Sequence, residues 1–97
     1  MVSLYTEKRV AEIVAHNVRQ LRLQANVSQR TLSERSGVAL STLRHFERSG
    51  QVSLFNLALI ATALGRTDDL VTLFKPKEAT SIDELTARAK PRKRARL

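Results

Sequence analysis

The sequence contains no cysteine, so disulfide scaffolds, thiolate zinc sites and cysteine nucleophiles are all excluded. Its longest purely apolar run, residues 57–61, is far shorter than the roughly 20 residues of a membrane-spanning helix. No positively charged and then apolar leader opens the chain, so we expect no secretory signal and a cytoplasmic protein. These absences favour a protein that neither spans a membrane nor depends on thiol chemistry.

The residues needed for an active site are also scarce. There are only two histidines, His16 and His45, and neither an H-E-x-x-H motif nor a glycine-rich phosphate loop is present. The one adjacent carboxylate pair, Asp68 and Asp69, falls at an expected helix start, where the helix dipole favours negative charge. We therefore expect no enzyme, no catalytic residue, no metal and no cofactor.

What the chain does have is a strong excess of positive charge. Its 97 residues, 42% of them hydrophobic, suffice for one small globular domain, and the formal net charge is +8. Residues 1–74 carry nine basic against six acidic side chains, whereas residues 75–97 carry eight against three. Such a balance predicts an anionic partner: nucleic acid, an anionic membrane surface or an acidic protein. We predict a domain over residues 1–74 and a basic, flexible tail over residues 75–97.

Apolar residues at helical spacing predict five helices in an all-α domain over roughly residues 8–74. The first helix covers about residues 7–25, where the apolar positions are Val10, Ile13, Val14, Val18, Leu21 and Ala25. Asn26 suits a left-handed residue after this helix, and Ser28 suits the N-cap of the next helix, which ends at Gly37.

Three further helices follow. Residues 39–48 form the third, with Leu43 and Phe46 pointing inward, and Gly50 closes it. Ser53 caps the fourth, whose predicted apolar face is Leu54, Leu57, Ile60, Ala61 and Leu64. Thr67 opens the fifth, which stops before Pro76. A capping-box spacing from Ser81 to Glu84 is compatible with a short additional helix in the tail.

Residues 28–47 form a recognisable unit: a capped helix, a glycine-containing turn with one apolar residue, and a second helix. Two helices joined in this way at a steep angle make a helix-turn-helix, whose second helix can enter the DNA major groove. With Leu43 and Phe46 facing the core, the outward faces of the second helix carry Ser41, Thr42, Arg44, His45 and Arg48. Two arginines and no acid on an outer face favour DNA as the partner.

The motif resembles the Cro/cI-type (XRE) helix-turn-helix family. That family's pattern runs L-R…S-Q-x-x-L-A-x-x-x-G-V-x-x-x-T-[IL]-x-x-[ILF]-E, and this chain has Leu21-Arg22, Ser28-Gln29, Leu32-Ser33, Gly37-Val38, Thr42-Leu43 and Phe46-Glu47. Residues 57–65 are similar to the family's fourth helix, so the resemblance covers about residues 13–74. It implies a five-helix, lambda-repressor-like fold.

The resemblance also implies roles for individual residues. The residues expected to face base edges are Ala39, Leu40, Ser41, Arg44 and His45. Arg44 could fork onto guanine, and Ala39 or Leu40 could meet a thymine methyl. The candidate phosphate contacts are Arg19, Gln29, Thr42 and Arg48, of which Gln29 would also buttress the recognition helix. Arg22 is expected to pair with Glu47 in a structural role. Each of three base-facing residues has an alternative role. Arg44 could be only a solvated arginine, Leu40 could be a packing residue, and His45 could be an exposed spacer.

Three features depart from the family pattern. One is that Ala39 and Leu40 stand where the family has polar residues at the start of the recognition helix. Ser33 replaces the usual alanine, and Glu47-Arg48-Ser49-Gly50 replaces the common E-N-G after the recognition helix. That last segment, with Val52-Ser53-Leu54 behind it and the basic tail, is similar to HipB-like antitoxins, which partner a HipA-type kinase toxin.

The implied function is a homodimeric repressor that binds a palindromic operator in double-stranded DNA, in the cytoplasm at the nucleoid, and neutralises a toxin. The alternative is a stand-alone dimeric regulator without a toxin partner. Dimerisation surfaces are not clearly marked. Residues 70–74 supply more apolar side chains than one helix face needs, unless a small core uses them all, and Val2, Leu4 and Tyr5 could pair as an exchanged strand. The tail could grip phosphates, fold on a partner or be inert.

Overall fold

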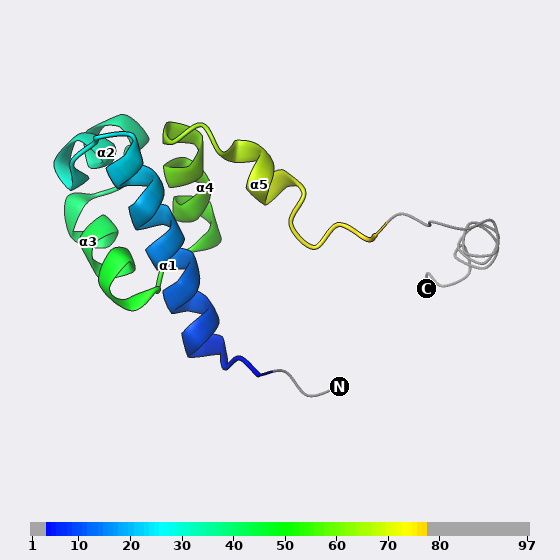
Figure 1. The fold of residues 1–97 in the computed structure, drawn as a ribbon. Coiled ribbons are helices and arrows are strands. Elements are labelled where there is room, and N and C mark those ends of the chain that lie inside the picture. The colour runs from blue at the N-terminus through cyan, green and yellow to red at the C-terminus, as the bar shows by residue number, and fades with distance from the viewer. Residues whose placement is uncertain (1–3, 78–97) are drawn as a thin grey trace, which may run out of the picture.

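The computed structural model describes residues 4–77, which form five α-helices and contain no strand (Figure 1). The helices are α1 (Glu7–Gln24), α2 (Gln29–Ser36), α3 (Leu40–Ser49), α4 (Leu54–Ala63) and α5 (Thr67–Val71). The predicted all-α class with five helices is therefore confirmed. Val2, the expected helix after Ser81 and the basic tail beyond residue 77 lie outside the described residues.

Side-chain caps set the starts of three helices. Ser28 Oγ accepts a hydrogen bond from the Thr31 amide at 3.0 Å, and Ser53 Oγ accepts one from the Asn56 amide at 3.0 Å, as predicted. Thr6 caps α1 in the same way through the Arg9 amide, and this cap was not among those predicted. Each hydroxyl satisfies an amide that has no partner within its helix.

Left-handed residues end the first three helices. Asn26 has the predicted positive φ of 58°, and Gly37 and Gly50 follow α2 and α3 with φ of 80° and 83°. Gly50 meets a second constraint, because a Cβ built on it would lie 2.6 Å from the carbonyl carbon of Ala11. Only glycine lets the end of α3 approach the backbone of α1 this closely.

The core lies where α1, α2, α3 and α4 meet. α1 packs against α3, and α2 packs against both α3 and α4. Its buried apolar residues are Ala15, Leu32, Val38, Leu43, Phe46 and Ile60. The inward orientation predicted for Leu43 and Phe46 is confirmed, and so is burial of Ile60. Figure 1 shows α1 crossing the domain, with α2 and α3 on one side and α4 on the other.

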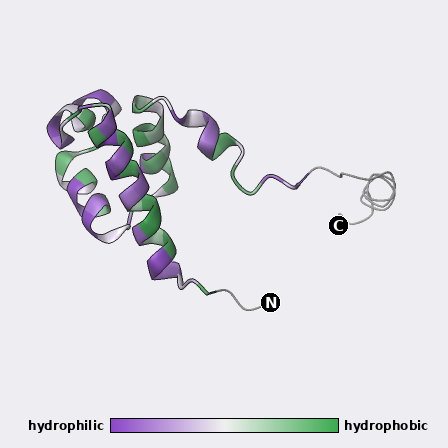
Figure 2. Ribbon diagram, in the orientation of Figure 1, coloured by the Kyte–Doolittle hydropathy of each residue, from purple (hydrophilic) through white to green (hydrophobic). Residues whose placement is uncertain are grey.

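Several predicted core positions are wrong. Leu54, assigned to the apolar face of α4, is 67% exposed, because its place six residues before Ile60 turns it roughly 120° away from that buried residue. The pattern is ambiguous since α4 consists largely of hydrophobic residues, as the colouring in Figure 2 shows. Val10 and Ala25, near the two ends of α1, are also exposed.

The apolar side chains of residues 70–74 are not all buried in the core. α5 packs against α4, and Leu70 lies half-buried in a groove between α1, α4 and α5. Val71 is 70% exposed and Phe74 93% exposed, with Phe74 in a left-handed conformation at φ 61°. Within residues 4–77, no helix combines the length and apolar content needed to cross a bilayer.

Candidate nucleic-acid interface

The turn between α2 and α3 is fixed by two serines of α2. Val38 is buried, and its backbone amide donates to Ser36 Oγ at 3.1 Å, while its carbonyl accepts from Ser33 Oγ at 2.6 Å. The Gly37 amide donates to the Ser33 carbonyl at 2.9 Å and closes the helix. Ser33, a departure from the family pattern, thus satisfies a carbonyl in the turn that an alanine would leave to other partners.

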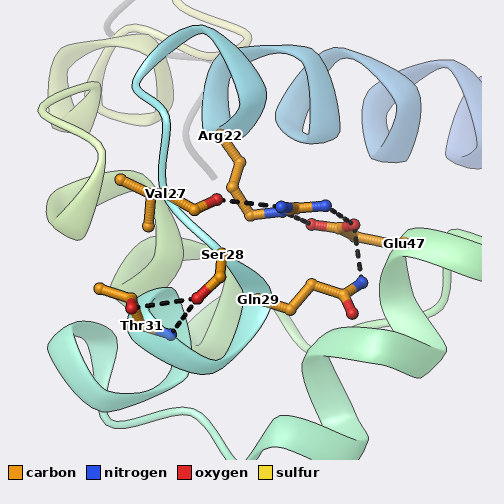
Figure 3. A network of polar contacts seen from close by, with 6 residues as sticks. All are labelled: Arg22, Val27, Ser28, Gln29, Thr31 and Glu47. Atoms are coloured by element: carbon orange, nitrogen blue, oxygen red, sulfur yellow. Dashed lines mark hydrogen bonds and ion pairs between the residues drawn. The ribbon is translucent and has the colours of Figure 1, made fainter.

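A buried ion pair joins α3 to the C-terminal end of α1. Arg22 Nε donates to Glu47 Oε2 at 2.7 Å, and Arg22 Nη2 donates to Glu47 Oε1 at 2.9 Å. Figure 3 shows the guanidinium and the carboxylate lying side by side in this two-point contact. Arg22 Nη1 also donates to the Val27 carbonyl at 3.0 Å, which ties the loop after α1 to the pair.

α2 completes the same network through Gln29. Its Nε2 donates to Glu47 Oε1 at 3.0 Å, from the first residue of α2 (Figure 3). The Glu47 side chain is 4% exposed and that of Arg22 8%, so water screens the pair little. The network fixes α3 against both α1 and α2, because its three side chains come from these three helices. Removing Arg22 or Glu47 alone would leave the other as a buried, unpaired charge. Arg22 and Glu47 therefore stand in the pairing that the family resemblance implies.

The surface of α3 away from the core is open to solvent. Ala39, Ser41, Arg44 and His45 are exposed, and Leu40 is half-buried. These are the five residues predicted to face bases. Ala39 lies just before α3, as its N-cap residue, instead of inside the helix. The structure thus places all five on or beside one helix. Three of them, Ser41, Arg44 and His45, are exposed residues within α3.

Polar contacts organise the C-terminal half of this face. The ring nitrogens of His45 lie 3.1 Å from Gln51 Oε1 and 3.5 Å from Arg48 Nη2. Ser49 Oγ donates to the His45 carbonyl at 2.7 Å and accepts from the Gln51 amide at 3.1 Å. The Ser49-Gly50 variant of the family's turn therefore holds the segment after α3 close to the recognition helix.

Three predicted phosphate contacts lie together, and a fourth lies elsewhere. Arg19, Gln29 and Arg48 line one shallow surface pocket of about 320 Å³, together with Arg44 and Glu47. Thr42 is half-buried, and being two positions from Arg44 it lies roughly 160° away around α3. Arg44, predicted to read a base, is thus a neighbour of the predicted phosphate contacts.

Some residues that shape the interface escape sequence reasoning. Ser36 and Gln51 contribute through side-chain hydrogen bonds that no spacing rule indicates, and Val27 contributes through a carbonyl that every residue carries. Ser33 was visible as a departure from the family pattern, which marked the position without revealing its partner. Within residues 4–77, no three histidine or acidic side chains gather as metal ligands would.

Comparison with known families agrees with this geometry. A family model described as helix-turn-helix (HTH_3) matches residues 18–71, which is more than half of the chain and spans α2, α3 and α4. No curated protein matches the chain significantly. Members of the matched family are DNA-binding regulators of transcription and not enzymes. The chain therefore belongs to the helix-turn-helix family of the Cro/cI (XRE) type.

Proposed function

We propose that the protein is a homodimeric, sequence-specific repressor that binds a palindromic operator, including one in its own operon. The observation that carries this proposal is the network of Arg22, Glu47 and Gln29. It fixes α3 from behind at three hydrogen bonds of 2.7–3.0 Å and leaves the opposite face open. A recognition helix must be held rigidly in this way, because base readout depends on the position of short side chains.

In the proposed complex, α3 lies in the major groove of each half-site. Ala39, Leu40, Ser41 and His45 face base edges, and Thr42, Gln29, Arg19 and Arg48 face phosphates. Two modules related by a twofold axis reach successive grooves about 34 Å apart and block access of polymerase. The protein acts at the nucleoid, in the cytoplasm.

Dimerisation is supported by the apolar side chains around the end of α5. Val71 and Phe74 are largely exposed, and Leu73 is half exposed, next to the groove between α1, α4 and α5. We expect Phe74→Ser to shift the sedimentation coefficient from dimer toward monomer. Leu4→Ser is the control for the alternative exchanged strand, since Leu4 is also almost fully exposed. A monomeric wild-type protein at micromolar concentration would refute the homodimer.

Operator binding is tested by selecting bound duplexes from a randomised pool. We expect the selected sites to be palindromic, with half-sites one helical turn apart. Ser41→Ala and His45→Ala should each relax the preference at one base position by about 1–3 kcal/mol. Lys8→Gln, in the exposed first turn of α1, removes one positive charge outside the residues proposed to face DNA and should leave the preferences unchanged. A pool that stays random after selection would refute sequence-specific binding.

We further propose that the protein is the antitoxin of a toxin pair and neutralises a HipA-type kinase. The support is the Glu47-Arg48-Ser49-Gly50 turn with Val52-Ser53-Leu54 behind it, and the basic tail. The test is affinity purification of the tagged protein from its host after nuclease treatment, followed by mass spectrometry. A near-stoichiometric, kinase-sized partner is the expected result. Recovery of the protein alone would favour the alternative, a stand-alone regulator.

A further inference from the structure

Three arginines from two helices meet at the pocket beside the ion pair. Arg19 comes from α1, while Arg44 and Arg48 lie one turn apart on α3, and Gln29 and Glu47 complete the lining. Residues four apart on a helix have Cβ atoms about 5–6 Å from each other, and like charges at that spacing are destabilising. The fold therefore places three arginines around one shallow surface pocket.

Glu47, the only acidic residue that lines this pocket, does not neutralise the three arginines. Both carboxylate oxygens of Glu47 are already used by Arg22, and Oε1 also accepts from Gln29. Within the described part of the chain, Arg19 and Arg44 form no hydrogen bond or ion pair through their side chains. Arg48 reaches only His45, at 3.5 Å. Three positive charges thus remain without a counter-charge from residues 4–77.

This arrangement fits a compact anion. The surface pocket, with a volume of about 320 Å³, is large enough for a tetrahedral phosphate. A guanidinium group can donate two parallel hydrogen bonds to the oxygens of one phosphate. An anion bound between the arginines would also offset the repulsion between their positive charges. The buried ion pair supports one wall, so the site exists before any ligand arrives.

We propose that Arg19, Arg44 and Arg48 form a preformed anion site that takes a single phosphate group. In the DNA complex this group is one backbone phosphate, a part that rests on the proposed function. Arg44 is then a phosphate contact and not the guanine reader that the sequence predicted. Its position agrees, because it lies three positions before Glu47, which places the two about 60° apart on the side of α3 toward the ion pair.

The first test uses inorganic phosphate alone, without DNA. Phosphate is titrated against the full chain at constant ionic strength, with chloride as the balancing ion, and the arginine Nε–Hε signals are followed by NMR. We expect saturable shifts for Arg19, Arg44 and Arg48, with Arg30 and Arg35 of α2 as internal controls. Arg44→Gln should abolish the saturation. Shifts that are equal for all five arginines and never saturate would overturn the anion site.

The second test uses the salt dependence of binding to a random-sequence duplex. Each neutralised phosphate contributes about 0.9 to the slope of log K against log salt concentration. Because the three arginines share one phosphate, the triple variant with Arg19, Arg44 and Arg48 changed to Gln should lose about one unit of slope. A loss near three would mean three separate phosphates, and no loss would mean none; either result overturns the proposal. Lys8→Gln is the control for the loss of one positive charge outside the pocket, and thermal unfolding checks that each variant is folded.

The two proposals fail in different ways. If Arg44→Gln weakens binding only to duplexes with one particular base, Arg44 reads that base and the shared-phosphate assignment is wrong while the repressor stands. If the wild-type protein binds no duplex at any salt concentration, the repressor proposal fails. The titration with inorganic phosphate then still decides whether the anion site exists.

Discussion

Gly50 offers the most direct test of how closely α1 and α3 must approach. Replacing it with alanine adds one methyl group at a residue whose φ is 83° and whose Cβ would lie 2.6–2.8 Å from three atoms of Ala11. Two of those atoms belong to the α1 backbone, so no side-chain rotation can relieve the overlap. Gly37 is the matched control, since its φ is 80° and a Cβ there meets nothing within 4 Å.

The expected losses of unfolding free energy differ because only one site adds an overlap. Left-handed strain costs an L-residue about 1–2 kcal/mol. A less flexible unfolded chain offsets about 0.4–1 kcal/mol of that. Gly37→Ala should therefore lose about 1 kcal/mol. Overpacking adds typically 1–3 kcal/mol, so Gly50→Ala should lose about 2–4 kcal/mol.

Urea unfolding followed by circular dichroism measures both variants at the same temperature, and thermal scans give a second reading. For a domain of this size, about 1 kcal/mol corresponds to a Tm change of roughly 4–8 °C. Equal losses for Gly50→Ala and Gly37→Ala would refute the close approach. Adding Ala11→Gly to Gly50→Ala should restore little stability, because the carbonyl carbon and oxygen of residue 11 remain in place.

Further predictions concern the ion pair, the core and the turn, all measured by urea unfolding. Arg22→Met and Glu47→Leu should each lose about 3–5 kcal/mol, because each leaves a buried charge, whereas the double variant should lose much less than their sum; additive losses would contradict the coupling. Ile60→Ala should lose about 2–5 kcal/mol, whereas Leu54→Ala should change stability by less than about 0.5 kcal/mol, and similar losses would contradict their different burial. Ser33→Ala should lose about 0.5–1.5 kcal/mol with the hydrogen bond to the Val38 carbonyl, and a neutral result would mean that water replaces the serine.

Local chemistry made much of the fold predictable. Ser28 and Ser53 could be identified as caps, and Gly37 as a helix end, because these residue types solve a local backbone problem that has few other solutions. Leu43 and Phe46 could be oriented because the polar residues around them leave one apolar face. Where α4 is apolar almost all round, the same reasoning failed at Leu54.

The candidate site was only partly accessible for a different reason. The resemblance implied that Arg22 meets Glu47, since that pairing belongs to the family pattern. Nothing in the sequence indicates that Arg19 shares a pocket with Arg44, because the two are on separate helices whose crossing depends on the whole core. The close contact of Gly50 with Ala11 depends on the same crossing.

On α3, the residues that hold the fold are separate from the outward residues Ser41 and Arg44, which has a consequence for evolution and engineering. Leu43, Phe46 and Glu47 fix the helix, while Ser41 and Arg44 make no side-chain hydrogen bond or ion pair within residues 4–77. Substitutions at such exposed positions usually change stability by less than about 0.5 kcal/mol. A library randomised at the outward positions alone should therefore consist mostly of folded proteins, so that new operator preferences can arise without compensating changes elsewhere in the domain.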